Sequence, residues 1–181
     1  MSETANTIVG HAIRMIRQGG YNSFSFRKIA EEMGIKSASI HYHFPNKEAL
    51  GVAVTERYDE EFFAGLGAAE DHEAPIAHYV ESFEGALASQ GAACMCGILA
   101  AEAGQLPETV REALGRFTER NLRWVEAALR REQPGWSEER VVDTASVIFS
   151  ALEGAITFAA MARKPEHLAQ VGGQLRRLVA G

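Results

Sequence analysis

The stretch "FSFRKIAEEMGIKSASIHYHFPNKEAL", from Phe24 to Leu50, decides the fold of this 181-residue chain. Apolar residues spaced by three and four predict a helix over Phe26–Met33, and Gly34 ends it. A second, short helix is expected over residues 37–43. Pro45 stops it, because the residue before a proline avoids helical geometry. The stretch therefore predicts two helices joined by a tight turn.

Capping residues fix where these helices begin. Ser25 is placed to cap the first helix, and Asn46 is placed to cap a long third helix that starts after Pro45. Glu48 lies in the first turn of that third helix, where the helix dipole favours negative charge. The third helix would clamp the first two against a common core.

The short helix has an apolar inner side and a different outer side. A helical wheel at 100° per residue places Ile40 and Phe44 together on the inner side. The outer side carries small and polar residues, and its members are Ala38, Ser39 and Tyr42, flanked by His41 and His43. This is the plan of a helix-turn-helix module, whose second helix enters the major groove of DNA. The alternative is that the two helices merely pack in a core, but the polar outer side argues against it.

The two histidines of the short helix could suggest a metal site. At a spacing of two, however, their side chains point about 200° apart on a helix. His41 and His43 therefore cannot chelate one ion together, and we expect neither a metal nor any other cofactor.

Phe24–Leu50 resembles the DNA-binding head of the tetracycline-repressor (TetR) family of bacterial regulators. The resemblance rests on residues that match the family pattern or replace like with like: Ser25, Ile29, Ala30, Gly34, Ile40, His43, Phe44, Asn46, Lys47, Glu48 and Leu50. The chain departs from the pattern at Lys36, Ala38 and His41, where the family usually has serine, glycine and tyrosine. The resemblance implies an all-α fold, with a DNA-binding head at residues 1–50 and a ligand-binding and dimerisation body at 51–181.

The resemblance also assigns roles within the head. Ala38, Ser39 and Tyr42 are expected near base edges, where small residues let the backbone approach. Contacts to the DNA backbone are expected from Lys36, His41, His43 and Lys47. The full set of expected DNA-binding residues is Ser25, Arg27, Lys36, Ser37, Ala38, Ser39, His41, Tyr42, His43 and Lys47.

The charge distribution agrees with this division. The formal net charge is −6, which argues against non-specific nucleic-acid binding by the whole chain. Residues 1–50, however, hold six basic and four acidic residues, a balance of +2, and three histidines. The remaining residues hold twelve basic and twenty acidic residues, a balance of −8. A mildly basic head is joined to an acidic body.

Helical spacing continues through the rest of the chain. The clamping helix is expected to run to about residue 66, and further helices at 75–90, 98–103, 107–132, 137–163 and from 165 onward, roughly nine in all. No run approaches the roughly 18 apolar residues that cross a bilayer. The N-terminus lacks the features of a signal peptide. We expect a cytoplasmic protein without a membrane partner.

The last two helices carry apolar residues on several faces. From Val141 to Ala162 apolar or small residues appear on nearly every face, and the last helix has a seam of Leu168, Val171, Leu175 and Leu178. A helix that is apolar all round must be buried, and a second subunit can bury it. The resemblance implies a homodimer through these two helices, which would present two heads to a near-palindromic operator. The alternative is that they complete a monomer core.

The resemblance further implies a small-molecule effector pocket in the body. The expected pocket residues supply aromatic bulk and a few polar points: Phe62, His78, Phe83, Cys94, Cys96, Phe117, Asn121, Trp124, Glu153 and Phe158. Glu153 is the strongest polar candidate because it lies in an otherwise apolar helix, although it could instead pair with an arginine.

Cys94 and Cys96 allow two interpretations. Thiols near a helix N-terminus can have a lowered pKa, so this pair could sense electrophiles or oxidants. Free cysteine is also among the most buried residue types, and we favour two small buried hydrophobes.

The sequence thus predicts a ligand-released repressor of transcription and not an enzyme. A small cysteine-dependent enzyme is the alternative from another class, but the sequence near Cys94 and Cys96 offers no convincing base. A helical adaptor that binds only protein is a third possibility, which DNA binding would exclude.

Overall fold

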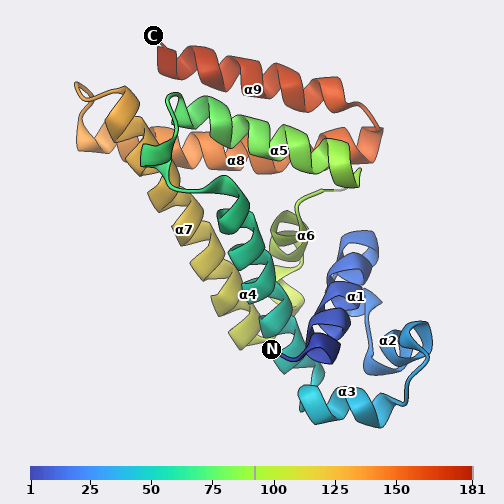
Figure 1. The fold of residues 1–181 in the computed structure, drawn as a ribbon. Coiled ribbons are helices and arrows are strands. Elements are labelled where there is room, and N and C mark those ends of the chain that lie inside the picture. Colours follow the sequence, from blue (N-terminus) through green and yellow to red (C-terminus); the bar gives the residue numbers. More distant parts are fainter. Residues whose placement is uncertain (92, 181) are drawn as a thin grey trace.

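The computed structural model describes residues 1–91 and 93–180, and within these ranges all regular structure is helical (Figure 1). The helices are α1 Glu3–Gly19, α2 Phe26–Met33, α3 Ser37–His43, α4 Lys47–Leu66, α5 Pro75–Gln90, α6 Met95–Ala101, α7 Glu108–Glu132, α8 Glu138–Ala162 and α9 Pro165–Ala180. Short 3-10 turns lie at Tyr21–Ser23, Ala69–Asp71 and Ala103–Gln105. The predicted all-α fold is confirmed.

The first three helices form the head, and local signals fix their ends as predicted. The Ser25 hydroxyl accepts from the backbone N–H of Lys28 at 3.3 Å, which caps α2. Gly34 ends α2 in the left-handed conformation at φ 66°, a region that glycine enters without steric cost. The Asn46 side chain accepts from the N–H of Ala49 at 2.8 Å and caps α4. Helix α3 is therefore held between two well-defined turns.

The body is built around two long helices that lead away from the head. Helices α4 and α7 lie side by side, and α5, α8 and α9 pack together at the end distant from α3 (Figure 1). Helix α6 lies between these groups and contacts α1, α7 and α8. The head is thus joined to the body through α1, α4 and α6.

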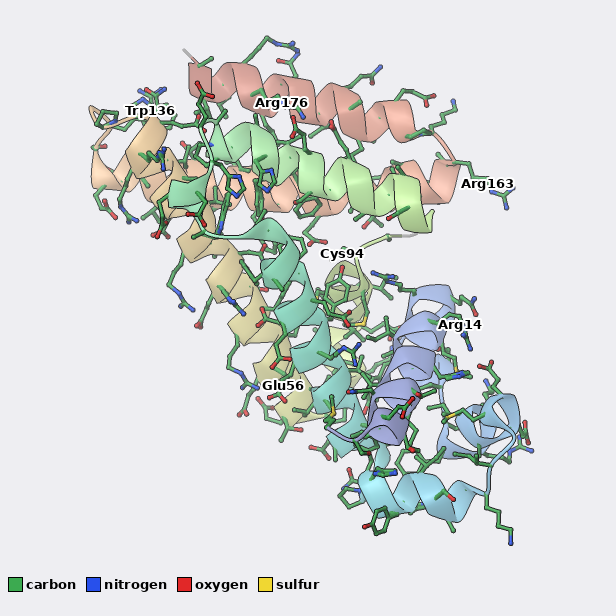
Figure 2. The ribbon with its side chains drawn as sticks, viewed as in Figure 1. Arg14, Glu56, Cys94, Trp136, Arg163 and Arg176 are labelled. Carbon is green, nitrogen blue, oxygen red and sulfur yellow. The ribbon has the colours of Figure 1, made fainter. Side chains whose placement is uncertain are left out.

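Ion pairs on the surface join neighbouring helices. Figure 2 labels Glu56 of α4 and Arg176 of α9, one member of each of two such pairs. Arg116 of α7 lies 3.2 Å from Glu56 of α4, and Arg176 of α9 lies 3.1 Å from Glu84 of α5. Exposed pairs of this kind contribute only about 0–1 kcal/mol each. The buried apolar core, which runs without interruption from head to body, therefore carries most of the stability.

The sequence placed α6 too late. It predicted a helix from about Ile98 to Ala103, whereas α6 spans Met95–Ala101. The backbone N–H of Ile98 already bonds to the carbonyl of Cys94 at 3.1 Å, so the helix includes Cys96 and Gly97. The glycines and cysteines of this segment resemble a break in the sequence, but buried Met95 and Leu99 hold it in helical form.

Helix α8 is more apolar than we expected from the sequence. We expected no stretch that could span a membrane, but an 18-residue window of α8 has a mean hydropathy of 1.6, enough by length and composition alone. Core helices of soluble proteins also meet this test, and α8 packs against α7 and α9. Only 33% of the window is buried in the monomer, which leaves apolar surface exposed.

Candidate functional site

The outer side of α3 is an exposed helical surface of the head. Ile40 is completely buried and Phe44 nearly so, and these two side chains anchor α3 to the core. Tyr42, on the opposite side, is 86% exposed, an unusual exposure for a large aromatic side chain. Lys36, Ala38, Ser39 and His41 are exposed as well. The geometry offers a short helix with its outer side free to enter a groove.

Aromatic contacts orient three of the expected DNA-binding residues. The His41 ring packs edge-on against Phe26 of α2, with 4.7 Å between ring centroids. Tyr42 and His43 also meet edge to face, at 5.1 Å. These contacts orient side chains that would otherwise move freely on the surface.

The remaining predicted DNA-binding residues surround α3. Arg27 is exposed on α2 and lies 3.7 Å from the Glu31 carboxylate, and Lys36 precedes α3 without capping it through its side chain. Ser25 and Ser37 are partly buried at the starts of α2 and α3. The structure gathers all ten predicted residues on α2, α3 and the start of α4.

Lys47 is more constrained than the sequence suggested. Its Nζ lies 4.5 Å from the centroid of the Tyr21 ring and 4.7 Å from that of Phe24. It also donates to Asn22 Oδ1 at 3.3 Å. Partial burial, with Lys28 as a smaller cause, lowers the pKa of the Lys47 ammonium. Lys47 therefore presents its charge from a fixed position at the start of α4.

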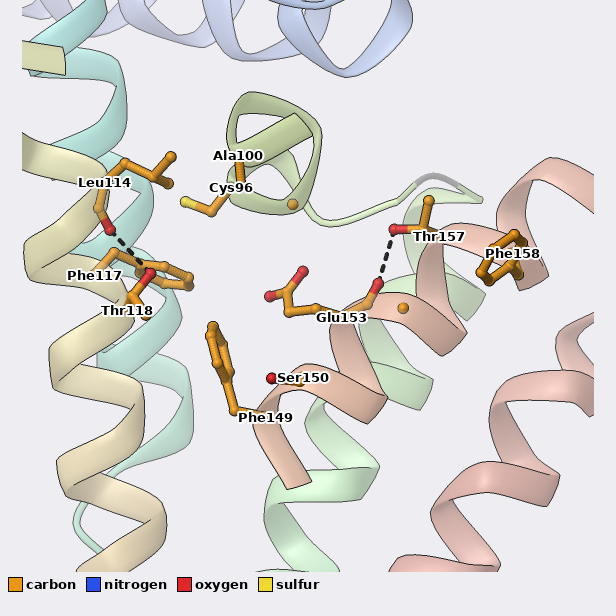
Figure 3. A pocket seen from close by; sticks show the side chains of 12 residues that line it. Cys96, Ala100, Leu114, Phe117, Thr118, Phe149, Ser150, Glu153, Thr157 and Phe158 are labelled. Atoms are coloured by element: carbon orange, nitrogen blue, oxygen red, sulfur yellow. Dashed lines mark hydrogen bonds between the residues drawn. The ribbon is translucent and has the colours of Figure 1, made fainter. Parts of the chain in front are cut away.

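The body contains a cavity of about 320 Å³ between α6, α7 and α8 (Figure 3). Its lining is mostly apolar or small, and the residues are Cys96, Gly97, Ala100, Leu114, Phe117, Thr118, Phe149, Ser150, Glu153, Gly154, Thr157 and Phe158. The volume lies at the lower end of the range for small-molecule sites. The cavity is large enough for a compact organic ligand.

Four of the ten predicted pocket residues line this cavity: Cys96, Phe117, Glu153 and Phe158. The other lining residues were not predicted from the sequence, although helical spacing could have identified some of them. Phe149, Ser150, Gly154 and Thr157 lie three or four positions from Glu153 or from each other, so they share a side of α8 with it. The residues that α6 and α7 contribute depend on packing between helices, which spacing alone does not give.

The other predicted pocket residues lie outside this lining. Asn121 is fully buried: its Oδ1 accepts from the Tyr79 hydroxyl at 2.7 Å and its Nδ2 donates to the Phe117 carbonyl at 2.9 Å. Trp124 donates from Nε1 to the carbonyl of Gly67 at 2.8 Å. The polar side-chain atoms that made Asn121 and Trp124 candidate ligand contacts are therefore hydrogen-bonded within the protein.

Phe62, Phe83 and His78 pack in the same part of the body. Phe62 and Phe83 meet edge to face with 6.0 Å between ring centroids. The His78 ring stacks on His72 at 3.7 Å, and its Nε2 lies 3.2 Å from the Leu66 carbonyl oxygen. These side chains join the end of α4 to α5.

The two thiols are buried next to the cavity. The Tyr58 hydroxyl donates to Cys94 Sγ at 3.4 Å. Hydrogen bonds from Cys96 and Tyr58 lower the pKa of the Cys94 thiol despite its burial, whereas burial raises the pKa of the Cys96 thiol. Cys94 is thus the better thiolate, and Cys96 is the one that lines the cavity.

Glu153 points into the cavity (Figure 3). Both of its carboxylate oxygens are buried, and neither has a hydrogen-bond partner that meets distance and angle criteria among the described residues. None of the ion pairs in the described part of the chain includes Glu153. The alternative that Glu153 pairs with an arginine is therefore not observed among the described residues. Burial, the largest cause, and nearby Cys94 raise the pKa of this carboxyl well above its ordinary value.

The N-terminal and the C-terminal parts of the chain each match a model of a known protein family. Residues 8–54 match the family model described as bacterial regulatory proteins, tetR family, and residues 68–174 match the C-terminal domain of LmrA/YxaF-like transcriptional regulators. The second match alone covers more than half of the chain.

One curated relative and one solved structure match nearly the whole chain, and another relative matches only part of it. The chain is 25% identical to the HTH-type transcriptional regulator LmrA of Bacillus subtilis over 93% of both proteins. A match to the uncharacterised regulator YuxN of Bacillus subtilis, at 35% identity, spans only 36% of this chain and 23% of that protein. A TetR transcriptional regulator from Legionella pneumophila superposes with a TM-score of 0.89, at 29% identity and over 98% of each chain. The chain belongs to the tetR family of bacterial transcriptional regulators.

Proposed function

We propose that this regulator is a homodimeric repressor that binds a near-palindromic operator and is released by a small molecule bound in the α6–α7–α8 cavity. The exposed outer side of α3 carries the proposal, because buried Ile40 and Phe44 face inward and Tyr42 is left exposed on the opposite side. We assign residues 1–50 to the DNA-binding domain, with its clamping helix α4 running on to Leu66, and residues 51–181 to the ligand-binding and dimerisation domain.

In this proposal α3 lies in the major groove. Ala38, Ser39 and Tyr42 face base edges, and Lys36, His41, His43 and Lys47 face phosphates. Ser25, Arg27 and Ser37 flank them at the starts of α2 and α3. Backbone N–H groups at the start of α4 also suit a phosphate, since the positive end of the helix dipole lies there.

The exposed apolar surface of α8 supports the dimer. Val147, Phe158 and Met161 are 53%, 57% and 73% exposed, and with Ser150 and Gly154 they follow one another at spacings of three and four. We call these five residues the outer face of α8. A second subunit would cover this face, and small residues within it would permit close approach of helices. Two heads about 34–36 Å apart would then read two half-sites.

Release requires that the effector bind one arrangement of the heads more tightly than the other. A differential affinity of about 5.5 kcal/mol would swing the population from 1:99 to 99:1. The cavity lies beside α6, which also contacts α1 of the head, so occupancy of the cavity can change how the head is held. Operator DNA lies in the cytoplasm of a bacterium, and we place the protein there.

The test is fluorescence anisotropy of the protein on duplex DNA from the region flanking its own gene, titrated with salt. Tyr42→Ala and Lys36→Ala remove exposed side chains of the head and should weaken binding. Lys36→Ala should also reduce the salt slope by about 1. Lys164→Ala, an exposed lysine of the body, is the matched control. Unchanged operator affinity in both head variants would rule out the proposed interface.

The thiols support a second candidate function, a sensor of electrophiles on the same fold. The observation is the hydrogen bond from Tyr58 to Cys94, whose thiolate could add to an electrophilic carbon while its proton passes to solvent. N-ethylmaleimide is a suitable probe: mass spectrometry should show one adduct that Cys94→Ser abolishes and that lowers operator affinity. An adduct that leaves DNA binding intact would exclude the sensor and leave the cysteines as core residues. The family is regulatory, and we propose no enzymatic role for these thiols.

A further inference from the structure

The charge and polarity of the cavity restrict what it can hold. Its lining contains one ionisable carboxyl, Glu153, and no basic side chain. An anionic ligand would face a carboxyl group and would find no positive partner among the lining residues. A wholly apolar ligand would leave the buried oxygens of Glu153 as unsatisfied as they are now. Buried polar groups without partners are costly, and they are rare in folded proteins.

The position of Glu153 is defined by close packing. A Cβ built at Gly97 of α6 would lie 2.6 Å from Glu153 Oε2, so only glycine leaves room for the carboxyl group there. Helix α6 therefore approaches α8 at the point where the acid is held. The carboxyl group cannot move further toward α6, and its side chain extends from α8 toward the residues of α6 and α7 that line the cavity (Figure 3).

Aromatic side chains complete the site. Phe117, Phe149 and Phe158 come from α7 and α8 and line the same cavity as Glu153. The face of an aromatic ring attracts a cation, most strongly where water is excluded. Phe158 is 57% exposed on the outer face of α8, so Phe117 and Phe149 are the two rings that lie near the carboxyl group (Figure 3). A carboxyl group beside two aromatic rings in a small cavity matches a cationic nitrogen attached to an apolar body.

We propose that the effector is a small, largely apolar amine whose protonated nitrogen pairs with the Glu153 carboxylate. The proposal rests on the proposed function, because it names the ligand class of that same cavity. The raised pKa of Glu153 favours the protonated acid in the empty cavity. When the ammonium group enters, a protonated carboxyl gives up its proton to solvent and accepts a hydrogen bond from the nitrogen. The buried charge is then paired, which removes the main cost of ionising it.

The cavity volume limits the size of the amine. At about 320 Å³ the space suits a body of one or two rings with a short chain. A suitable probe series keeps one such body and changes only the polar end: 4-phenylbutylamine, 4-phenylbutan-1-ol and butylbenzene.

Isothermal titration calorimetry of the three probes tests the proposal. 4-Phenylbutylamine should bind the wild-type protein roughly 10- to 100-fold more tightly than butylbenzene, the gain expected from a charge-assisted hydrogen bond. Glu153→Gln should remove most of that gain and leave butylbenzene binding unchanged. Glu139→Gln, an exposed acid on the same helix, is the matched control and should bind all three probes as the wild type does.

A second variant guards against a folding artefact. Gly97→Ala keeps the carboxyl group but displaces it, so it should also weaken 4-phenylbutylamine binding while circular dichroism shows an intact helical fold. Equal binding of 4-phenylbutylamine and butylbenzene to the wild type, or equal binding of the amine to wild type and Glu153→Gln, would overturn the proposal. So would failure of all three probes to bind.

The same proteins separate this inference from the proposed function. Operator binding without any probe tests the regulator by itself. If operator DNA binds and 4-phenylbutylamine does not, the inference about the effector fails alone. If the amine binds through Glu153 but no operator is bound, the inference stands and the DNA-binding proposal fails.

Discussion

The carboxylate of Glu102, at the end of α6, accepts a hydrogen bond from the backbone N–H of Tyr21 at 2.7 Å. Tyr21 belongs to the head, 81 positions away in sequence, and α6 lines the cavity with Cys96, Gly97 and Ala100. Gly20 is packed so closely against Glu102 that an added Cβ would collide with the carboxylate. One side chain thus connects the cavity helix directly to the backbone of the DNA-binding head.

Glu102→Ala should destabilise the protein by about 1–3 kcal/mol, because it leaves the N–H of Tyr21 without its partner. Urea unfolding followed by circular dichroism measures the change. Glu60→Ala, at an exposed acid of α4, should stay within about 0.5 kcal/mol of the wild type. If both variants unfold at the same urea concentration, the bond does not hold the head to α6.

Two glycine replacements should have opposite effects. An added Cβ at Gly51 of α4 would lie 2.9 Å from the Tyr21 ring and 3.0 Å from Val110 Cγ2, so Gly51→Ala should cost about 1–3 kcal/mol through overpacking. Gly85 of α5 has open space around it, and Gly85→Ala should add about 0.5–1 kcal/mol through helix propensity. Thermal melts of the two variants would contradict this packing if both shifted in the same direction.

Glu153 should make stability depend on pH. Its folded-state pKa is raised, so between the ordinary carboxyl pKa and the raised value the folded state binds a proton that the unfolded state has lost. Unfolding free energy should therefore fall as pH rises, by up to about 1.4 kcal/mol per pH unit for one proton. The groups that face Glu153 are Tyr79 of α5 with Cys94 and Cys96.

Glu153→Gln removes that dependence. Relative to wild type, the variant should gain stability as pH rises above the ordinary carboxyl pKa and show no gain below about pH 4, where the carboxyl is protonated in both states. Urea midpoints at each pH give the difference. Parallel curves for the two proteins would mean that Glu153 is ionised in the fold.

Val147→Glu should dissociate the proposed dimer. The change places a charge on the outer face of α8, where Val147 is 53% exposed, and the monomer fold should be unaffected. Sedimentation velocity should show a monomer for Val147→Glu and a dimer for wild type. Ala64→Glu, at an exposed position of α4, should remain dimeric. A dimeric Val147→Glu would move the interface elsewhere.

The head could be predicted almost residue by residue because its signals are local. The caps at Ser25 and Asn46 act on N–H groups three positions away, and the turn at Gly34 needs only one backbone conformation. The cavity could not be predicted in this way, because Leu114 and Gly97 meet Glu153 only after α6, α7 and α8 pack. Glu153 was identifiable as an acid in an apolar helix, but its lack of a partner is a property of the packed state.

The contact between Lys47 and the rings of Tyr21 and Phe24 affects the entropy that DNA binding would cost. A free lysine loses up to about 2 kcal/mol of rotamer entropy when it is immobilised. Two rings and Asn22 already hold Lys47 in the free protein. Most of this side-chain entropy is therefore lost on folding and is not lost again on DNA binding. The Lys47 side chain at the start of α4 is therefore preorganised in the free protein for its proposed contact with a DNA phosphate, which favours tighter binding.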